Sequence, residues 1–171
     1  MNRRPEQDEF HSYYSTYVAM VPEGDIITIL EKQIEETIDL LEDLSDDQAL
    51  FRYGEDKWSI KEVLGHVTDT ERVFSYRLLS IARGETAALP GYDQNAYVEM
   101  ASFDNQPLVL LVENFRAVRQ STLYLLKSLN EDTWLLRGNA NGSDVTVRAL
   151  AYMIAGHELH HRRILQERYL K

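Results

Sequence analysis

The sequence contains no cysteine, so it can form neither a disulfide nor a thiolate metal site, and it offers no nucleophilic thiol of its own. It also lacks any run approaching the roughly 18 consecutive apolar residues of a membrane span. The first ten residues are polar and charged where a secretory signal would need an apolar core. We therefore expect a cytoplasmic protein with no membrane partner, and any thiol in its chemistry must come from outside.

Positive charge is scarce, since 18 lysines and arginines face 28 aspartates and glutamates, which gives a formal net charge of −10. Neutralising nucleic-acid phosphates needs a basic surface, so we expect no nucleic-acid partner. The one basic cluster lies at the end of an expected helix, where cations complement the helix dipole. It consists of Arg162, Arg163, Arg168 and Lys171.

Sustained alternation with a period of two, which marks half-buried strands, is absent, and four stretches instead carry apolar residues at helical spacing. The pattern predicts an all-α fold, a four-helix bundle. The expected helices begin near Asp25, at Ser59, after Pro107 and near Thr146. Ser59 with Glu62 three residues later has the pattern of a capping box.

The chain has the length of one domain, residues 1–171, and its hydrophobic content of 44% suffices for a core. Between the second and third helices lie roughly twenty residues, 85–106, far more than the two to eight that join adjacent antiparallel helices. We interpret this segment as a long crossover connection that spans the bundle, with a short helix at 95–100. The first 24 residues are rich in tyrosine and are expected to pack over the bundle.

Histidines occupy the core-facing side of the fourth expected helix. At about 100° per residue, His157 and His161 fall about 40° apart within the apolar stripe, whereas His160 lies at its margin. Imidazoles four residues apart stand one turn above the other, so both can bind one ion. His66, at the border of the apolar face of the second helix, could reach across as a third ligand. His11 lies in an irregular segment and is expected to be a surface or packing residue.

Other polar residues adjoin these candidate ligands. Thr70 and Arg77 fall in line with His66 along the second helix, where they could meet a substrate oxygen or an anionic group. Glu158 belongs to the pattern His-Glu-x-x-His that begins at His157, in which zinc proteases use the Glu to polarise a metal-bound water. A protease is not expected, because only ten residues follow the second histidine and none of them is histidine. Glu158 is then either a proton carrier or a solvated residue of the helix face.

Two motifs stand out in the second and fourth expected helices. Residues 58–66 read Trp-Ser-Ile-Lys-Glu-Val-Leu-Gly-His, and residues 156–161 read Gly-His-Glu-Leu-His-His. Together they resemble the DinB-like (DinB/YfiT) superfamily, and the likeness spans nearly the whole chain. The resemblance implies a four-helix bundle with an unusual long connection and a three-histidine site for nickel, zinc or a related ion, often in a homodimer. Carried over residue by residue, the family's metal ligands fall on His66, His157 and His161.

The resemblance also implies a metal-dependent hydrolase, or an enzyme that transfers a low-molecular-weight thiol such as bacillithiol or mycothiol to a small electrophile. Three neutral imidazoles leave a divalent ion charged and open, so a bound water or thiol can become a nucleophile near pH ~7. We therefore expect a metal-dependent enzyme for a small-molecule substrate, with Arg77 or Glu158 assisting. Zinc or nickel is the expected ion, although iron, manganese and copper also accept three nitrogen ligands.

Two alternatives are compatible with the same residues. In the first, the bundle is non-catalytic and binds a small ligand or partner, with the metal as a structural clip between helices. In the second, the histidines are simply core residues. Replacing His157 by Leu should then leave stability intact or improve it.

Overall fold

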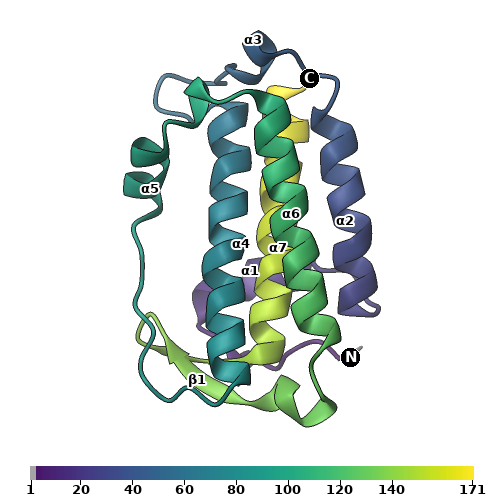
Figure 1. Cartoon of the computed structure of the whole chain (residues 1–171), viewed down its shortest axis with the longest axis vertical. Coiled ribbons are helices and arrows are strands. Elements are labelled where there is room, and N and C mark those ends of the chain that lie inside the picture. The colour runs from purple at the N-terminus through teal and green to yellow at the C-terminus, as the bar shows by residue number, and fades with distance from the viewer. Residues whose placement is uncertain (1–2) are drawn as a thin grey trace.

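A computed structural model describes residues 3–171 and shows a bundle of four long helices (Figure 1). These are α2 (Ile26–Leu41), α4 (Ile60–Ala82), α6 (Leu108–Lys127) and α7 (Val147–Ile164). Shorter elements are the helices α1 (Ser15–Met20), α3 (Asp46–Ala49) and α5 (Gln94–Ala101), and the strands β1 (Arg137–Ala140) and β2 (Ser143–Thr146). Single helical turns occur at Gln7–Glu9, Ser12–Tyr14, Phe103–Asn105, Glu131–Leu135 and, after α7, Leu165–Tyr169. The predicted four-helix bundle is confirmed.

Side-chain caps fix the starts of the bundle helices where the sequence predicted them. Asp25 and Thr146 each accept a hydrogen bond from the backbone N–H three residues later, which satisfies a donor that the first turn of a helix leaves free. Ser59 and Glu62 form the reciprocal capping box at the start of α4. Pro107 directly precedes α6. These local signals set the register in which each helix presents its buried face.

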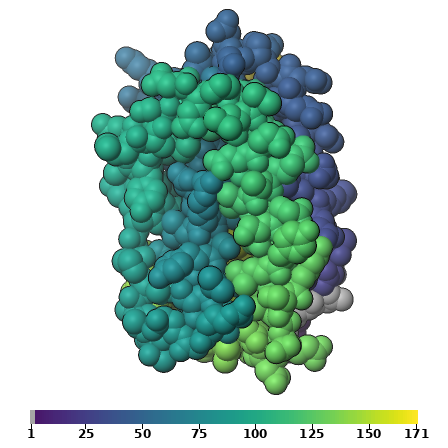
Figure 2. Space-filling model, viewed as in Figure 1, coloured from purple at the N-terminus to yellow at the C-terminus, as the bar shows by residue number. Residues whose placement is uncertain are grey.

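The directions of the helices explain the long connection. In Figure 1, α2 and α7 run toward one end of the bundle, and α4 and α6 run toward the other. Because α4 and α6 are parallel neighbours, the chain must return along the bundle between them, as the sequence predicted for this crossover connection. The connection carries α5, and Figure 2 shows a hollow between it and the body of the bundle. Leu89 ties its first half to the strands through backbone hydrogen bonds with Asn139 and Asn141, both 2.9 Å long.

The short helices α1 and α3 and a β-hairpin were not predicted: β1 and β2 form this antiparallel hairpin between α6 and α7, in which Arg137 pairs with Thr146. Asn141 and Gly142 connect the strands with φ angles of 54° and 76°, the pair of positive values that a tight two-residue hairpin turn requires. Strands of four residues are too short to display a clear alternation.

The N-terminal segment packs against the bundle as predicted, apart from residues 1 and 2, which lie outside the described residues. Val18 and Val21 are buried in the core. Arg4 donates hydrogen bonds to the carbonyl oxygens of both residues. Glu9 forms an ion pair with Arg148 of α7, and both side chains are buried. Apolar burial and buried charge together hold this segment on α7.

The core consists of two apolar clusters with buried polar side chains between them. On α4, for example, Thr70 and Glu71 separate Val67 of one cluster from Phe74 of the other. On α2, α6 and α7, buried polar residues likewise lie at or next to the junction of the two clusters. We call the intervening set the polar layer: Gln33, Thr37, His66, Thr70, Glu71, Arg119, Thr122, His157 and Glu158. In the range 3–171, no helix is long and apolar enough to cross a membrane.

Candidate metal centre

Three histidines meet in the polar layer, between α4 and α7. His66 and His157 are 3% and 7% exposed, and His161 lies half-buried at the edge of the group. Nε2 of His157 is 3.0 Å from Nε2 of His66 and 3.1 Å from Nε2 of His161. The structure therefore brings together the three residues that the sequence singled out as ligands, two of them one turn apart on α7.

The three nitrogens form a group that could hold a metal ion, since one ligand atom from each ring lies within 4.8 Å of the others. Two nitrogens bound to one ion at about 2.1 Å can be no more than about 4.2 Å apart. The separations of 3.0 and 3.1 Å satisfy that limit. Hydrogen bonding alone explains the group less well, because Nε2 of His157 faces two neighbours but carries only one proton or one lone pair. The donor set fits a cation.

Burial keeps these imidazoles neutral. Desolvation lowers the pKa of His66 to about 4, with a smaller contribution from charge on His160. Desolvation, aided by repulsion from neighbouring histidines, also holds the pKa values of His157 and His161 well below the usual range. All three rings are therefore in the neutral form at neutral pH. Each then offers one nitrogen lone pair, as metal ligation requires.

His66 is supported from two sides. The Thr70 hydroxyl makes a long contact of 3.4 Å with Nδ1 of His66 and lies 2.7 Å from the Tyr92 hydroxyl. The Trp58 ring packs against the imidazole with 4.7 Å between ring centres. Because Tyr92 belongs to the crossover connection, that segment helps to orient a candidate ligand on α4. The predicted position of Thr70 next to His66 is confirmed.

The N-terminal helix α1 covers His157. The Tyr17 ring lies 5.7 Å from the ring of His157 and 5.1 Å from that of His160, measured between centres. His160 is half-buried beside Tyr17, which agrees with its predicted place at the margin of the apolar stripe. The sequence analysis assigned no role to Tyr17. The available signal was the concentration of tyrosines at 13–17.

A glycine precedes each buried ligand and lets a covering segment come close. A Cβ on Gly156 would lie 2.1 Å from the backbone oxygen of Tyr17, and one on Gly65 would lie 2.5 Å from the ring of Phe103. Both separations are too short for a side chain to exist there. Helix α1 and Phe103 approach these two positions so closely because both residues are glycine.

Glu158 is buried, so its interpretation as a solvated residue is wrong. The side chain is 1% exposed, and its two oxygens accept hydrogen bonds from the Thr37 hydroxyl and from Arg119. Arg119 also forms a two-bond ion pair with Glu71, and the two N–O distances are 2.8 Å. A role for Glu158 as proton carrier stays a prediction, and its carboxylate is not part of the three-nitrogen group. The solvated interpretation failed because α2 and α6 cover this face of α7.

Arg119 and Glu71 were not identified from the sequence. Arg119 follows Phe115 by four positions on the buried face of α6, a spacing that could have flagged it. Arg77, the other predicted assisting residue, is buried at 4% exposure and donates a hydrogen bond of 2.6 Å to the carbonyl oxygen of Pro90. Its guanidinium therefore contacts the crossover connection.

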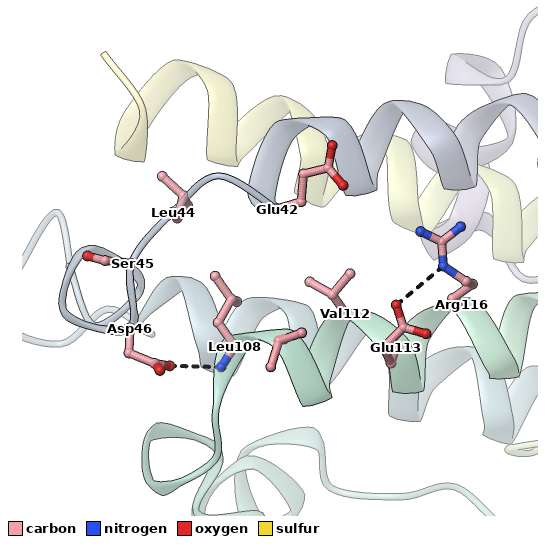
Figure 3. Close-up of a pocket in the computed structure, with 9 residues that line it drawn as sticks. Glu42, Leu44, Ser45, Asp46, Leu108, Val112, Glu113 and Arg116 are labelled. Carbon is pink, nitrogen blue, oxygen red and sulfur yellow. Dashed lines mark hydrogen bonds and ion pairs between the residues drawn. The ribbon is translucent and has the colours of Figure 1, made fainter.

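A separate groove of about 430 Å³ runs between the end of α2 and the first half of α6 (Figure 3). On its wall, Glu113 lies 3.6 Å from Arg116, and Asp46 accepts a hydrogen bond of 2.8 Å from the Leu108 N–H. The groove is lined by none of the three histidines. The groove therefore adds no ligand to the metal centre.

The sequence matches the family model of the DinB superfamily over residues 29–165. In structure the chain is similar to YfiT from Bacillus subtilis, described as a probable metal-dependent hydrolase with an unusual four-helix bundle topology. The TM-score is 0.77 and the identity 17%, over 97% of this chain and 91% of that one. Such a likeness shows the fold. Among curated proteins, none matches the sequence.

Two further solved structures share the fold. A DinB-like protein from Bacillus subtilis, YjoA, is 22% identical with a TM-score of 0.61, over 84% of this chain and 87% of that one. The mycothiol-dependent maleylpyruvate isomerase is 13% identical with a TM-score of 0.67, over 81% of this chain. The matched region covers 58% of the isomerase, so this chain corresponds to little more than half of that protein.

Proposed function

The chain belongs to the DinB superfamily, and from that premise we propose that it is a metal-dependent enzyme acting on a small-molecule substrate. His66, His157 and His161 would hold one divalent cation, with zinc or nickel as the expected ion. The observation that carries the proposal is the convergence of three imidazole nitrogens from two helices within 4.8 Å of one another. Because His66 lies on α4 and the other two histidines lie on α7, the site forms only when these helices pack together.

A cation held by these rings would supply Lewis acidity, which turns a bound water or thiol into a nucleophile near neutral pH. The residues of the chain prepare the site for it. Thr70 supports the orientation of the His66 ring. The rings of Trp58 and Tyr17 pack against the buried ligands and exclude water from their side of the site. His161 is half-buried, so substrate has its best approach along this edge.

Water and a low-molecular-weight thiol are the two nucleophiles that we propose. The description of YfiT as a probable metal-dependent hydrolase supports water, and the mycothiol dependence of the isomerase supports a thiol. Because this chain has no cysteine, the thiol would have to be a co-substrate. The two possibilities share the same metal centre and differ only in the group that the cation activates.

Turnover tests the proposal. Metal-loaded protein is assayed for hydrolysis of an activated ester, and for conjugation of monochlorobimane with and without bacillithiol. We expect one of these reactions to depend on the metal, and to fall at least about 100-fold in a His157→Gln variant because a ligand is lost. Glu113→Gln, which alters an exposed side chain in the separate groove, serves as the matched control and should retain activity.

Failure of both reactions with fully loaded protein would contradict the enzyme proposal. The metal would then act only as a clip between α4 and α7. In that case, its removal should lower stability without affecting any turnover.

A further inference from the structure

Arg77 is a buried cation without an acidic partner. The other buried arginines, Arg119 and Arg148, each pair with a carboxylate. Among residues 3–171, no ion pair includes Arg77, and its only hydrogen bond is the one to the carbonyl oxygen of Pro90. A guanidinium has five N–H donors, and arginine is seldom buried without an anion. Most of the donors of Arg77 are therefore free for a ligand.

The Arg77 side chain lines a narrow cavity between α4, the start of α7 and the hairpin. This cavity has a volume of about 20 Å³, room for roughly one water. His11, Tyr14 and Ser143 line both it and a neighbouring cavity of about 280 Å³, so the two share a wall. Asp144 also lines the narrow cavity, but it is exposed and forms no ion pair with Arg77. The guanidinium of Arg77 thus lies in the wall of the narrow cavity, next to the larger one.

Arg77 and the candidate metal centre flank the same aromatic ring. The guanidinium carbon of Arg77 lies 5.8 Å from the centre of the Phe74 ring, which lies 6.3 Å from the centre of the His157 ring. The guanidinium carbon and the imidazole centre are therefore at most about 12 Å apart, the sum of these separations. Tyr14 packs edge-on against Phe74 and lines the narrow cavity. This separation is within the length of a small molecule, and the buried Phe74 ring lies along the line between the two groups, since the three histidines line neither cavity.

We infer that Arg77 binds a carboxylate of the substrate, so that the substrate is a small organic acid whose reacting atom lies at the end opposite its acid group. This inference rests on the proposed function, because the metal centre defines the reacting end. The planar fork of a guanidinium matches a carboxylate with two parallel hydrogen bonds. The unpaired nitrogens of Arg77 are not among the buried atoms without a partner, so they are accessible to such a group.

Metal-free protein tests Arg77 by itself. Binding of hexanoate and of its neutral analogue hexanamide is measured by NMR titration of the wild type and of Arg77→Gln. We expect the wild type to bind hexanoate about tenfold more tightly than hexanamide, and Arg77→Gln to bind the two alike. Arg72→Gln removes an exposed arginine from the same helix and should keep the preference. Equal binding of both probes by the wild type, or a preference that survives Arg77→Gln, would overturn the inference.

A second variant covers the case in which Arg77→Gln does not fold. Arg77→Lys keeps the charge but loses the fork, so we expect the preference for hexanoate to fall several-fold while some remains. An unchanged preference in this variant would count against recognition by the guanidinium.

Cobalt-loaded protein separates this inference from the proposed function. 6-Mercaptohexanoate and 6-mercaptohexanol are titrated, and the thiolate-to-cobalt charge-transfer absorption reports the thiol at the metal. We expect both thiols to produce the band, with the acid effective at about tenfold lower concentration. No band with either thiol would contradict the proposed activation of thiols while leaving the hexanoate result standing. A band at equal concentrations of the two thiols would contradict the role of Arg77.

Discussion

Individual charges in the polar layer are compensated in two different ways. His66 and His157 avoid charge altogether, because desolvation lowers their pKa values. Arg119 keeps its charge and contacts two carboxylates, those of Glu71 and Glu158, with every side chain at most 2% exposed. Breaking such a group is costly, because it leaves an unpaired charge in a medium of low dielectric constant. Removing the charge of Arg119 should therefore destabilise the bundle.

Replacing Arg119 by Met tests this view. The variant leaves two buried carboxylates facing each other, so we expect the free energy of unfolding to fall by about 3 to 5 kcal/mol in urea titrations. Arg116→Met on the same helix is the matched control. Its exposed ion pairs with Glu35 and Glu113 should contribute no more than about 1 kcal/mol.

Restoring neutrality should restore stability. Adding Glu71→Gln and Glu158→Gln to Arg119→Met removes the repulsion, and the triple variant should recover part of the loss. If Arg119→Met is as stable as Arg116→Met, the ion pairs of Arg119 do not hold the layer together.

Helix α1 and the end of the crossover connection pack closely against α7 and α4, the helices that carry the candidate ligands. Helix α1 approaches α7 so closely that the backbone of Tyr17 occupies the space of a Gly156 side chain. The end of the crossover connection does the same to Gly65 through Phe103. Gly65 directly precedes His66 on α4, and Gly156 directly precedes His157 on α7. The helical turn that carries each of these ligands therefore also forms the contact with the segment packed against it.

Substituting Gly156 by Ala should displace α1. The added Cβ meets a backbone oxygen, which cannot rotate away as a flexible side chain could, so we expect a loss of about 1 to 3 kcal/mol and faster amide hydrogen exchange in α1. Gly54→Ala is the matched control, because its Cβ would meet only the flexible chain of Lys57 at 3.2 Å. Equal exchange rates in α1 for the two variants would show that close packing at Gly156 does not hold this helix.

The sequence predicted elements better than it predicted contacts between them. Capping residues such as Ser59 and helical spacing located the four bundle helices, and the spacing of His157 and His161 located half of the site. The hairpin escaped because four-residue strands carry little pattern. Arg119 escaped because a charged residue on a helix is ordinarily solvated, and only tertiary packing revealed its partners. Tyr17 was missed because the tyrosine-rich N-terminal segment indicates packing on the bundle but not which residue contacts the histidines.

The polar layer lies between the two apolar clusters and contains the candidate ligands His66 and His157. Helices α4 and α7 each pass through both clusters, so their register at the layer is fixed from both ends. His66 on α4 and His157 on α7 then face each other at 3.0 Å without any local connection between them. A cation bound there would link two helices that are already aligned, so binding should stabilise the fold as a whole.

Titration of metal-stripped protein with Zn²⁺ or Ni²⁺ in a calorimeter, followed by thermal unfolding, tests the central claim most directly. We predict uptake of one ion per chain and a rise in the unfolding temperature of several degrees, equivalent to about 3 kcal/mol at a hundredfold excess over the dissociation constant. His66→Ala and His157→Ala should lose both effects, whereas Glu113→Gln should keep them. No uptake by the wild type, or equal uptake after either histidine is replaced, would contradict the three-histidine metal centre.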